Sequence, residues 1–218
     1  MLRGIFVTGT DTNVGKTVVS AALMVRYRAE APLRYWKPIQ TGTDHDDDSR
    51  EVARLAGTSE IFDAGVRLPT PVSPHLAARL AGTRITVRSL LDVIHDETNV
   101  RWIIEGAGGA LVPINERELM VDLMQAFDLP VLIAARSALG TINHTLLTIE
   151  GLRRRMLRVA GVVMVGDPND ENRLAIEKYG AAEVIAQMPR FDPLTPDALQ
   201  QWVGAEFDPS GVLFGCLR

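Results

Sequence analysis

Short apolar runs alternate with amphipathic stretches along most of the chain. The apolar runs are typical of buried strands and cover residues 5–8, 33–37, 100–104, 131–135, 159–165 and 184–187. Between them, apolar positions recur at helical spacing over residues 16–28, 49–55, 86–95, 118–127, 143–154 and 171–179. Because the strands are apolar at nearly every position, we expect helices on both faces of a mostly parallel sheet, which is an α/β architecture. Ligands of such a sheet bind at the carboxyl ends of its strands.

Three segments carry weaker patterns. Polar residues fill the stretch 40–48, which we expect to be an exposed link between elements. Pro69, Pro71 and Pro74 predict a loop, and the tail from Pro209 onward has no clear pattern. The chain holds no internal repeat and no low-complexity linker, and its 218 residues suit one compact domain. We therefore expect the whole chain to form a single α/β domain.

The composition narrows the classes of partner. Hydrophobic residues make up 46% of the chain and the formal net charge is -4, so no basic face is expected that would bind nucleic acid or a membrane. Cys216 is the only cysteine, which excludes an intrachain disulfide and fits a reducing cytoplasm. The apolar runs are shorter than the ~18 residues of a membrane span, and the first residues lead directly into a strand rather than a leader. We expect a cytoplasmic protein whose partners are small molecules or protein.

The segment GTDTNVGKT, residues 9–17, lies between the first strand and the first helix. This is the context of a phosphate-binding P-loop, although five residues rather than four separate Gly9 from Gly15. Gly15 lets the backbone approach a phosphate, the amides at the helix start point toward it, and Lys16 adds a compact charge. An ordinary glycine-rich turn would not require Lys16 followed by Thr17, whose hydroxyl suits Mg²⁺. The sequence therefore predicts a nucleoside triphosphate site.

Acidic residues fall at two places near this edge of the predicted sheet. Glu105 ends an apolar strand and precedes the small residues 106–109, which allow a ligand close to the backbone. We expect its carboxylate to emerge beside the P-loop and to serve a Mg²⁺ site, rather than to be a solvent-exposed strand end. Asp46, Asp47 and Asp48 form the second group. It suits either a metal ligand or a solvated loop in which Asp48 caps the next helix, and the residues alone leave both open.

Five segments taken together resemble the dethiobiotin synthetase family of the biotin pathway: GTDTNVGKT, YWKPIQTG, PVSPHLAA, IIEGAGG and LGTINHTLLT. They follow one another in the family's order over most of the chain, and the irregular spacing of the P-loop is itself the family's form. The resemblance implies a P-loop NTPase fold and an ATP- and Mg²⁺-dependent reaction. In that reaction 7,8-diaminononanoate and CO₂ become the cyclic urea dethiobiotin through a carbamate and a carbamic-phosphoric anhydride, with release of ADP and phosphate.

The resemblance also implies roles for individual residues. Lys16 and Lys37 match lysines that serve the transferring phosphoryl group, while Thr12 and Thr41 match positions that line the diamine or carbamate. The implied metal ligands are Thr17, Asp48 and Glu105. The implied nucleotide site comprises Asn13, Val14, Gly15, Lys16, Thr17, Val18, Glu105, Gly108 and Val165. The substrate's tail carboxylate is bound in the family at a helix start across a two-fold interface, which implies a homodimer and corresponds here to Leu139, Gly140 and Asn143.

Some of these residues would be interpreted differently without the resemblance. Lys37 would be an exposed lysine at a strand end held by Pro38, and Asn143 would be a helix cap. Two positions depart from the family pattern. Asn13 replaces a glutamate found in many members, which removes a charge close to the substrate amines. Val165 stands where the family often has an asparagine that reads the adenine base, so we expect weaker selection among nucleoside triphosphates.

Two other functions are compatible with a P-loop. A switch ATPase of the partition and amidotransfer group usually places a second lysine early in the loop, which this loop lacks. A ligase that amidates a cobalamin precursor requires a further glutaminase domain, for which 218 residues leave no room. Both alternatives predict no turnover with the diamine. His75 and His144 lie in the matched segments, but the reaction requires neither.

Overall fold

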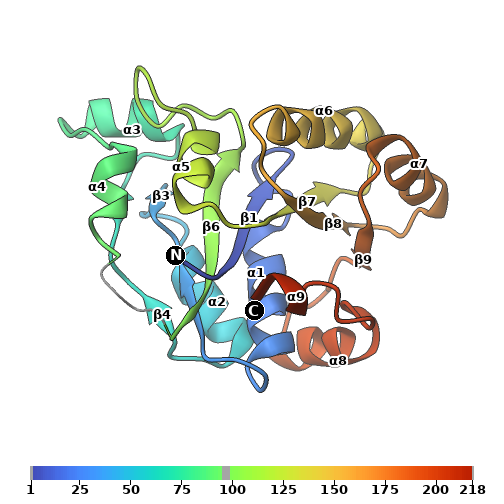
Figure 1. Cartoon of the computed structure of the whole chain (residues 1–218). Helices are drawn as coiled ribbons and strands as arrows, with labels where there is room; N and C mark the ends of the chain where they lie inside the picture. The colour runs from blue at the N-terminus through green and yellow to red at the C-terminus, as the bar shows by residue number, and fades with distance from the viewer. Residues whose placement is uncertain (1, 95–98, 218) are drawn as a thin grey trace.

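A computed structural model describes residues 2–94 and 99–217. Within this part of the chain, seven strands form one sheet in the order β4-β2-β6-β1-β7-β8-β9, and all neighbouring strands are parallel (Figure 1). Its strands are β1 (Gly4–Gly9), β2 (Leu33–Trp36), β4 (Ile61–Phe62), β6 (Arg101–Gly109), β7 (Val131–Arg136), β8 (Val159–Val165) and β9 (Val184–Met188). A separate pair of short parallel strands consists of β3 (Ile39–Thr41) and β5 (Val66–Leu68). The expected parallel α/β sheet is confirmed.

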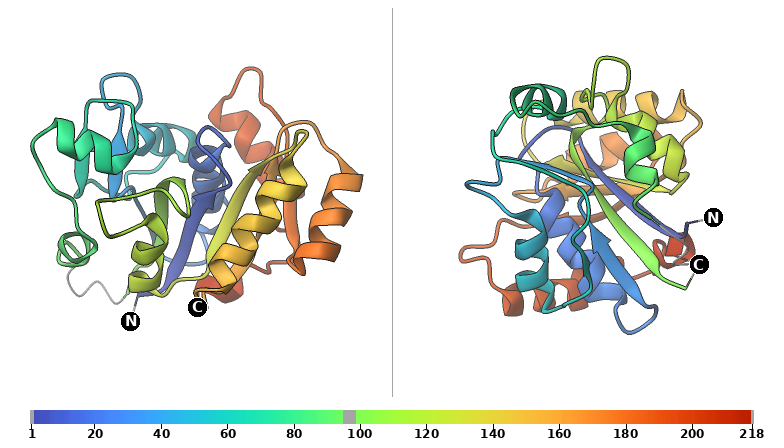
Figure 2. Two further views of the ribbon diagram at one scale, coloured as in Figure 1. Left: turned by 90° about the horizontal axis from the view of Figure 1, so that it is seen from above. Right: turned by 90° about the vertical axis from the view of Figure 1, so that its left-hand side faces the viewer.

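Helices cover both faces of the sheet, as the two orientations in Figure 2 show. On one face, α1, α2 and α8 enclose a core that includes Val19 and Trp202; on the other, α5, α6 and α7 enclose a core that includes Phe127 and Ile149. The helices are α1 (Lys16–Tyr27), α2 (Asp48–Ala56), α3 (Pro74–Leu80), α4 (Val87–Leu91), α5 (Met120–Phe127), α6 (Thr141–Arg153), α7 (Asp170–Gly180), α8 (Pro196–Glu206) and α9 (Phe214–Leu217). Among the helices described, none is long and apolar enough to cross a membrane.

The central strand β1 is the element that positions the P-loop. It lies between β6 and β7, and the register places Gly9 opposite both Gly109 of β6 and Ala134 of β7. A Cβ added at Gly109 would lie 3.2 Å from the Gly9 carbonyl oxygen, so the two backbones approach closely and leave little room for a side chain. The segments after β1 and β6 therefore meet at the same edge of the sheet. This is the edge at which ligands were expected.

Several expectations about individual elements are wrong. The segment after Pro71 is not all loop, because α3 begins at Pro74, where the missing N–H of a proline costs the helix nothing. The helix expected at 86–95 is shorter, since α4 ends at Leu91, and its expected last residue, His95, lies outside the described residues. Strand β6 continues to Gly109 rather than ending at Glu105.

The C-terminal region also differs from the expectation. An additional helix, α8, follows Thr195, whose side chain accepts a hydrogen bond from the Ala198 N–H and so caps the helix start. The tail from Pro209 is packed rather than loose, because Leu213 and Leu217 are buried in the same core as α1. Its apolar residues are too few to show a period in the sequence, but they join the core that α1, α2 and α8 share.

Candidate functional site

The P-loop wraps the start of α1 in a conformation that specific residues permit. Asn13 has φ 54° and Gly15 has φ 91°, both in the left-handed region, which asparagine and glycine adopt more readily than other residues. A Cβ at Gly15 would also lie 2.9 Å from a methyl group of Val165, so Val165 packs directly against the loop. Val14 is buried in the core beneath it. An asparagine at position 13 therefore suits the backbone of this loop.

Lys16 opens α1 and is only 7% exposed. Its ammonium group donates a hydrogen bond to the Asp11 carbonyl oxygen at 3.0 Å, so the side chain folds back along the loop. Burial and the nearby charge of Lys37 lower the pKa of Lys16 to about 8, although Glu105 and Asp48 act in the opposite direction. Lys16 thus presents a partly desolvated positive charge to whatever lies over the loop.

Glu105 is fully buried inside β6, and its two carboxylate oxygens have different partners. Oε1 accepts hydrogen bonds from the Lys37 ammonium at 2.7 Å and the Thr17 hydroxyl at 3.1 Å. Oε2 accepts from the Tyr35 hydroxyl at 2.9 Å and the Ser20 hydroxyl at 3.0 Å. Four donors from α1, β2 and the segment after β2 therefore hold one buried acid. The expectation of a strand-end carboxylate is corrected to one inside the strand, yet it does face the P-loop.

Lys37 lies between two carboxylates. Its Nζ is 2.6 Å from Asp48 Oδ2 and 2.7 Å from Glu105 Oε1, and it also donates to the Gly106 carbonyl oxygen at 3.1 Å. Burial alone would lower the pKa of Lys37, but the attraction of Glu105 and Asp48 outweighs it and raises the pKa above its ordinary value. Burial similarly opposes ionisation of Asp48, but Lys37 and Thr17 hold the pKa of that carboxyl below its usual range. Lys37 and Asp48 are therefore each held in the charged form at neutral pH.

Asp47 and Asp48 have different hydrogen-bond partners at the start of α2. Asp47 is the residue that caps this helix, because its side chain accepts a hydrogen bond from the Arg50 N–H at 3.0 Å. The carboxylate of Asp48 instead accepts from the Thr17 hydroxyl at 3.0 Å, inside the site. The alternative in which Asp48 caps the helix is thus wrong.

The oxygen atoms of Thr17, Asp48 and Glu105 make a donor set that fits Mg²⁺. The Thr17 hydroxyl lies within 3.1 Å of both carboxylates, so all three side chains converge on one point. Hard oxygen ligands, two of them anionic, are what Mg²⁺ prefers beside the phosphate oxygens of a nucleotide. The ammonium group of Lys37 bridges the same two carboxylates, which marks this point as a place where the protein holds positive charge.

A cleft of about 390 Å³ collects most of the site residues expected from the sequence. These are Thr12, Asn13, Gly15, Lys16, Thr17, Val18, Lys37, Thr41, Asp48, Glu105 and Gly108. Val14 and Val165 lie behind the loop instead. The remaining three, Leu139, Gly140 and Asn143, lie at the start of α6 and do not line this cleft. Gly140 is in the N-cap position of α6, so Asn143 is not the cap that the residues alone favoured.

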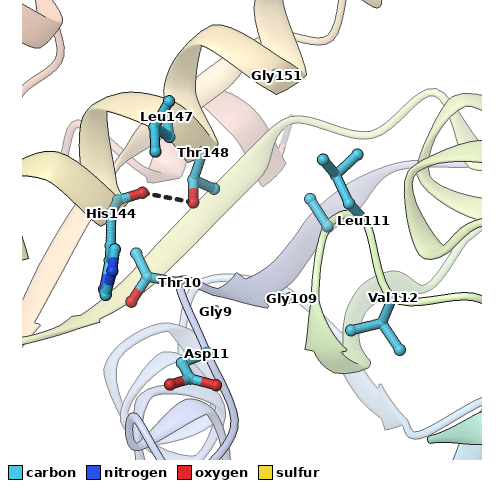
Figure 3. Close-up of a pocket in the computed structure, with 11 residues that line it drawn as sticks. Gly9, Thr10, Asp11, Gly109, Leu111, Val112, His144, Leu147, Thr148 and Gly151 are labelled. Atoms are coloured by element: carbon cyan, nitrogen blue, oxygen red, sulfur yellow. Dashed lines mark hydrogen bonds between the residues drawn. The ribbon is translucent and has the colours of Figure 1, made fainter.

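A second cleft, of about 400 Å³, lies on the other side of the P-loop (Figure 3). Thr10 and Asp11 approach it from the loop, Leu111 and Val112 from the segment after β6, and His144, Leu147 and Thr148 from α6, as the labelled side chains show. Leu111 and Leu147 are each 58% exposed. This mainly apolar cleft was not foreseen, although Leu147 and Gly151 recur along α6 with the four-residue spacing of one helix face.

Three polar residues that organise the site were also missed. Ser20 and Tyr35 hold Glu105, and Gln40 holds the start of α2, because its Oε1 accepts from the Asp48 N–H at 3.1 Å. A weak signal existed for two of them. Ser20 follows Thr17 by three residues, which puts both on one helix face. Tyr35 precedes Lys37 by two residues, which puts both on the same face of an extended strand. The expectation that residues 40–48 are an exposed link is wrong at Gln40, which is buried.

Comparison with known proteins assigns the chain to a family. A family profile described as "AAA domain" matches residues 3–198. The chain is 52% identical over 194 residues to the ATP-dependent dethiobiotin synthetase of Paramagnetospirillum magneticum, which covers 89% of this chain and 91% of the relative. It is 46% identical over 209 residues to the enzyme of the same name from Agrobacterium fabrum, with 95% of each covered. A biotin biosynthesis bifunctional protein of Bordetella avium is 47% identical over 92% of this chain and 42% of its own length.

Solved structures agree on the fold at much lower identity. A ParA family ATPase from Chlorobium tepidum superposes with a TM-score of 0.54 and 12% identity over 98% of this chain and 92% of its own. The septum site-determining protein MinD of Pyrococcus horikoshii, complexed with Mg-ADP, has a TM-score of 0.54 and 14% identity over 92% of this chain and 86% of its own. These likenesses show a P-loop NTPase fold. With the P-loop site and the identities of the curated relatives, they establish that the chain belongs to the ATP-dependent dethiobiotin synthetase family.

Proposed function

We propose that the chain is the ATP-dependent ligase of biotin biosynthesis that closes 7,8-diaminononanoate with CO₂ to dethiobiotin, releasing ADP and phosphate. The observation that carries the proposal is the cluster of Lys16, Thr17, Lys37, Asp48 and Glu105 in one cleft at the carboxyl edge of the sheet. The identity of 52% to a protein named for this activity supports it. The substrate, the intermediates and the role of each residue are parts of this proposal.

The proposed chemistry proceeds in three steps. One amine of the substrate adds to CO₂ and loses a proton, which gives a carbamate. A carbamate oxygen then attacks the γ-phosphorus of ATP, ADP leaves, and a carbamic-phosphoric anhydride remains. The second amine attacks the carbonyl carbon of this anhydride, loses a proton and expels phosphate as the urea ring closes. Because the second step brings two anions together, it depends on positive charge that is already in place.

The side chains of the cleft suit that requirement. Lys16 would hold the β- and γ-phosphates together with the backbone amides from Asn13 to Val18. Lys37 would hold the carbamate and the transferring phosphoryl group. Mg²⁺, held by Thr17, Asp48 and Glu105, would supply charge neutralisation on the phosphate oxygens.

The position of Lys37 between Asp48 and Glu105 has a consequence for this role. Mg²⁺ bound by these two carboxylates would weaken the attraction that holds the Lys37 ammonium group between them. Lys37 could then turn toward the carbamate, while Thr12 and Thr41 line the same cleft for the diamine. The nucleotide would extend past Gly108 and along the loop toward Val165.

A homodimer forms part of the proposal. Leu139 is fully exposed just before α6, and Leu111 and Leu147 are each 58% exposed at the second cleft. Exposed leucines that line a cleft, as Leu111 and Leu147 do, are typical of a surface that another chain covers. In the dimer, the start of the partner's α6, with the residues that correspond to Leu139, Gly140 and Asn143, would meet the tail carboxylate of the substrate. Backbone N–H groups at a helix start suit an anion.

The deciding experiment measures phosphate release with ATP, bicarbonate and the diamine, and identifies dethiobiotin by mass. We expect phosphate release that depends on the diamine and a product of the mass of dethiobiotin. ATP hydrolysis that is equally fast without the diamine would favour a switch ATPase and would overturn the proposal. Parallel assays with GTP and CTP test base selection at Val165, and strict dependence on ATP would contradict the expectation of weak selection.

A further inference from the structure

Tyr35 and Ser20 hold one oxygen of Glu105 and leave the other to the cleft. The Tyr35 and Ser20 hydroxyls both donate to Oε2, at 2.9 and 3.0 Å, whereas Thr17 and Lys37 both donate to Oε1. Tyr35 and Ser20 are themselves 0% exposed. The proposed metal ligand is therefore anchored on its inner side by two donors that do not line the cleft.

We propose that Tyr35, together with Ser20, is a positioning residue that orients the Glu105 carboxylate for Mg²⁺. The proposal rests on the metal role of Glu105 in the proposed function. Neither hydroxyl would touch the metal or the substrate, so both would act only through Glu105.

The register of the sheet explains why a tyrosine reaches this place. Tyr35 of β2 lies opposite Ile103 of β6. Glu105 is two residues further along β6, about 6.6 Å at a rise of ~3.3 Å per residue, and its side chain is on the same face as that of Ile103. A long side chain that leans along its strand can span this offset, whereas serine at position 35 would be too short. Ser20 approaches the same oxygen from α1, so the two donors come from different elements and fix the plane of the carboxylate.

The anchor also has a charge-related function. A buried carboxylate oxygen without a partner carries a large desolvation cost, and two hydroxyl donors offset it. Because Lys37 contacts the other oxygen, the orientation of Glu105 would persist when the Lys37 ammonium moves to the substrate. Partners of this kind typically change metal affinity by 10- to 100-fold.

The test compares Tyr35→Phe with Tyr27→Phe. Tyr27 is an ideal control because it is also fully buried and also donates to a carboxylate, that of Asp208, outside the site. Two quantities are measured: the Mg²⁺ concentration that gives half-maximal turnover, and the affinity for Mn²⁺ in the presence of ADP, followed by electron paramagnetic resonance. We expect Tyr35→Phe to weaken both by about 10-fold, with kcat at saturating Mg²⁺ within about threefold of the wild type. Tyr27→Phe should leave both quantities unchanged while lowering the unfolding temperature.

Wild-type metal affinity in Tyr35→Phe, or an equal loss in both variants, would overturn the proposal. Ser20→Ala removes the other donor to Oε2 and provides a second variant if Tyr35→Phe does not fold; it should also weaken Mn²⁺ binding, and wild-type affinity there would count against the anchor. The Mn²⁺ measurement needs no diamine. Weakened Mn²⁺ binding in an enzyme without diamine-dependent turnover would therefore refute the proposed function and leave the positioning role intact.

Discussion

At the scale of single residues, the two lysines of the site are more buried than their sequence context suggests. Lys37, taken without the family resemblance, would be an exposed strand-end lysine, but Lys16 is 7% and Lys37 is 4% exposed. Lys37 holds together Asp48 and Glu105, so its removal leaves two carboxylates without their common cation. A substitution of Lys37 therefore affects stability as well as turnover.

We predict that Lys37→Met reduces kcat by at least about 10²- to 10³-fold, because in the proposed reaction it removes a charge that would meet the transferring phosphoryl group. We also expect the free energy of unfolding to fall by about 2 kcal/mol, less than for a fully buried pair because one of the two carboxylates is partly exposed. This change corresponds to an unfolding temperature that is lower by roughly 4–8 °C. Mg²⁺ should raise the unfolding temperature of this variant more than that of the wild type. Turnover assays and thermal unfolding with and without Mg²⁺ provide the measurement.

The sequence contains three lysines, and the third offers a matched control. Lys178 lies in the last turn of α7, beside the ring of Tyr179 and away from both clefts. Lys178→Met should leave kcat and the response to Mg²⁺ unchanged. Normal turnover in Lys37→Met would return Lys37 to the role of a strand-end lysine.

At the scale of elements, the side chain of one acidic residue, Asp208, holds the C-terminal segment in place through hydrogen bonds. Asp208 is 2% exposed and has φ 46°. Its carboxylate accepts hydrogen bonds from the Tyr27 hydroxyl of α1 and from the N–H groups of Val212 and Leu213, the latter two at 2.8 Å. The ring of Phe214 in α9 stacks on Tyr27 with centroids 6.0 Å apart. The segment after α8 is thus attached to the first helix of the chain.

We predict that Asp208→Ala destabilises the protein by about 1–3 kcal/mol, because it leaves the buried Tyr27 hydroxyl and two backbone amides, one of them buried, without their acceptor. Diamine-dependent turnover should remain near that of the wild type, since Asp208 lies outside both clefts. Denaturant unfolding measures the change, and Glu206→Ala, an exposed position two residues away, serves as the control within about 0.5 kcal/mol. Equal stability of the two variants would contradict the anchoring role.

The reactivity of the Cys216 thiol measures how well the same C-terminal segment is packed. Burial raises the pKa of its thiol, so at pH 8 the folded chain has a smaller thiolate fraction than the unfolded chain. The thiol of the wild type should therefore react slowly with iodoacetamide, and that of Asp208→Ala faster.

At the scale of the whole molecule, the P-loop separates two clefts with different chemistry. One cleft, of about 390 Å³, is charged, and the other, of about 400 Å³, has a mainly apolar surface that includes the exposed Leu111 and Leu147. The proposed dimer would cover the apolar side and leave the charged cleft to the nucleotide. Since both clefts share the P-loop, assembly and catalysis would be adjacent in space.

We predict that the wild type is a dimer by light scattering and that Leu147→Glu weakens the dimer by more than tenfold, because it would bury an unpaired charge in an apolar contact. Leu174→Glu is the control, since Leu174 is 50% exposed on α7 and does not line the second cleft. A monomeric wild type, or equal effects of the two substitutions, would refute the proposed interface.

Much of the fold and part of the site were determined by the sequence itself. Runs of apolar residues specify parallel strands because both faces of each strand must be buried, and the loop from Gly9 to Thr17 is a local motif whose glycine, lysine and threonine act within a few residues of one another. Both features depend on neighbours along the chain. They can therefore be interpreted without knowledge of distant contacts.

Tertiary structure alone decided the features that depend on residues far apart in the sequence. Strands β3, β4 and β5 have two or three residues each, too few for a period, and they form because their partners are nearby in space. Likewise, Asp47 and Asp48 are adjacent acids, and only the start of α2 turns one to a cap and the other to Thr17. Tyr35 and Glu105 are 70 residues apart, and the parallel pairing of β2 and β6 brings them together. A sequence pattern records which side chains must be buried, but the register of the sheet decides which of them meet.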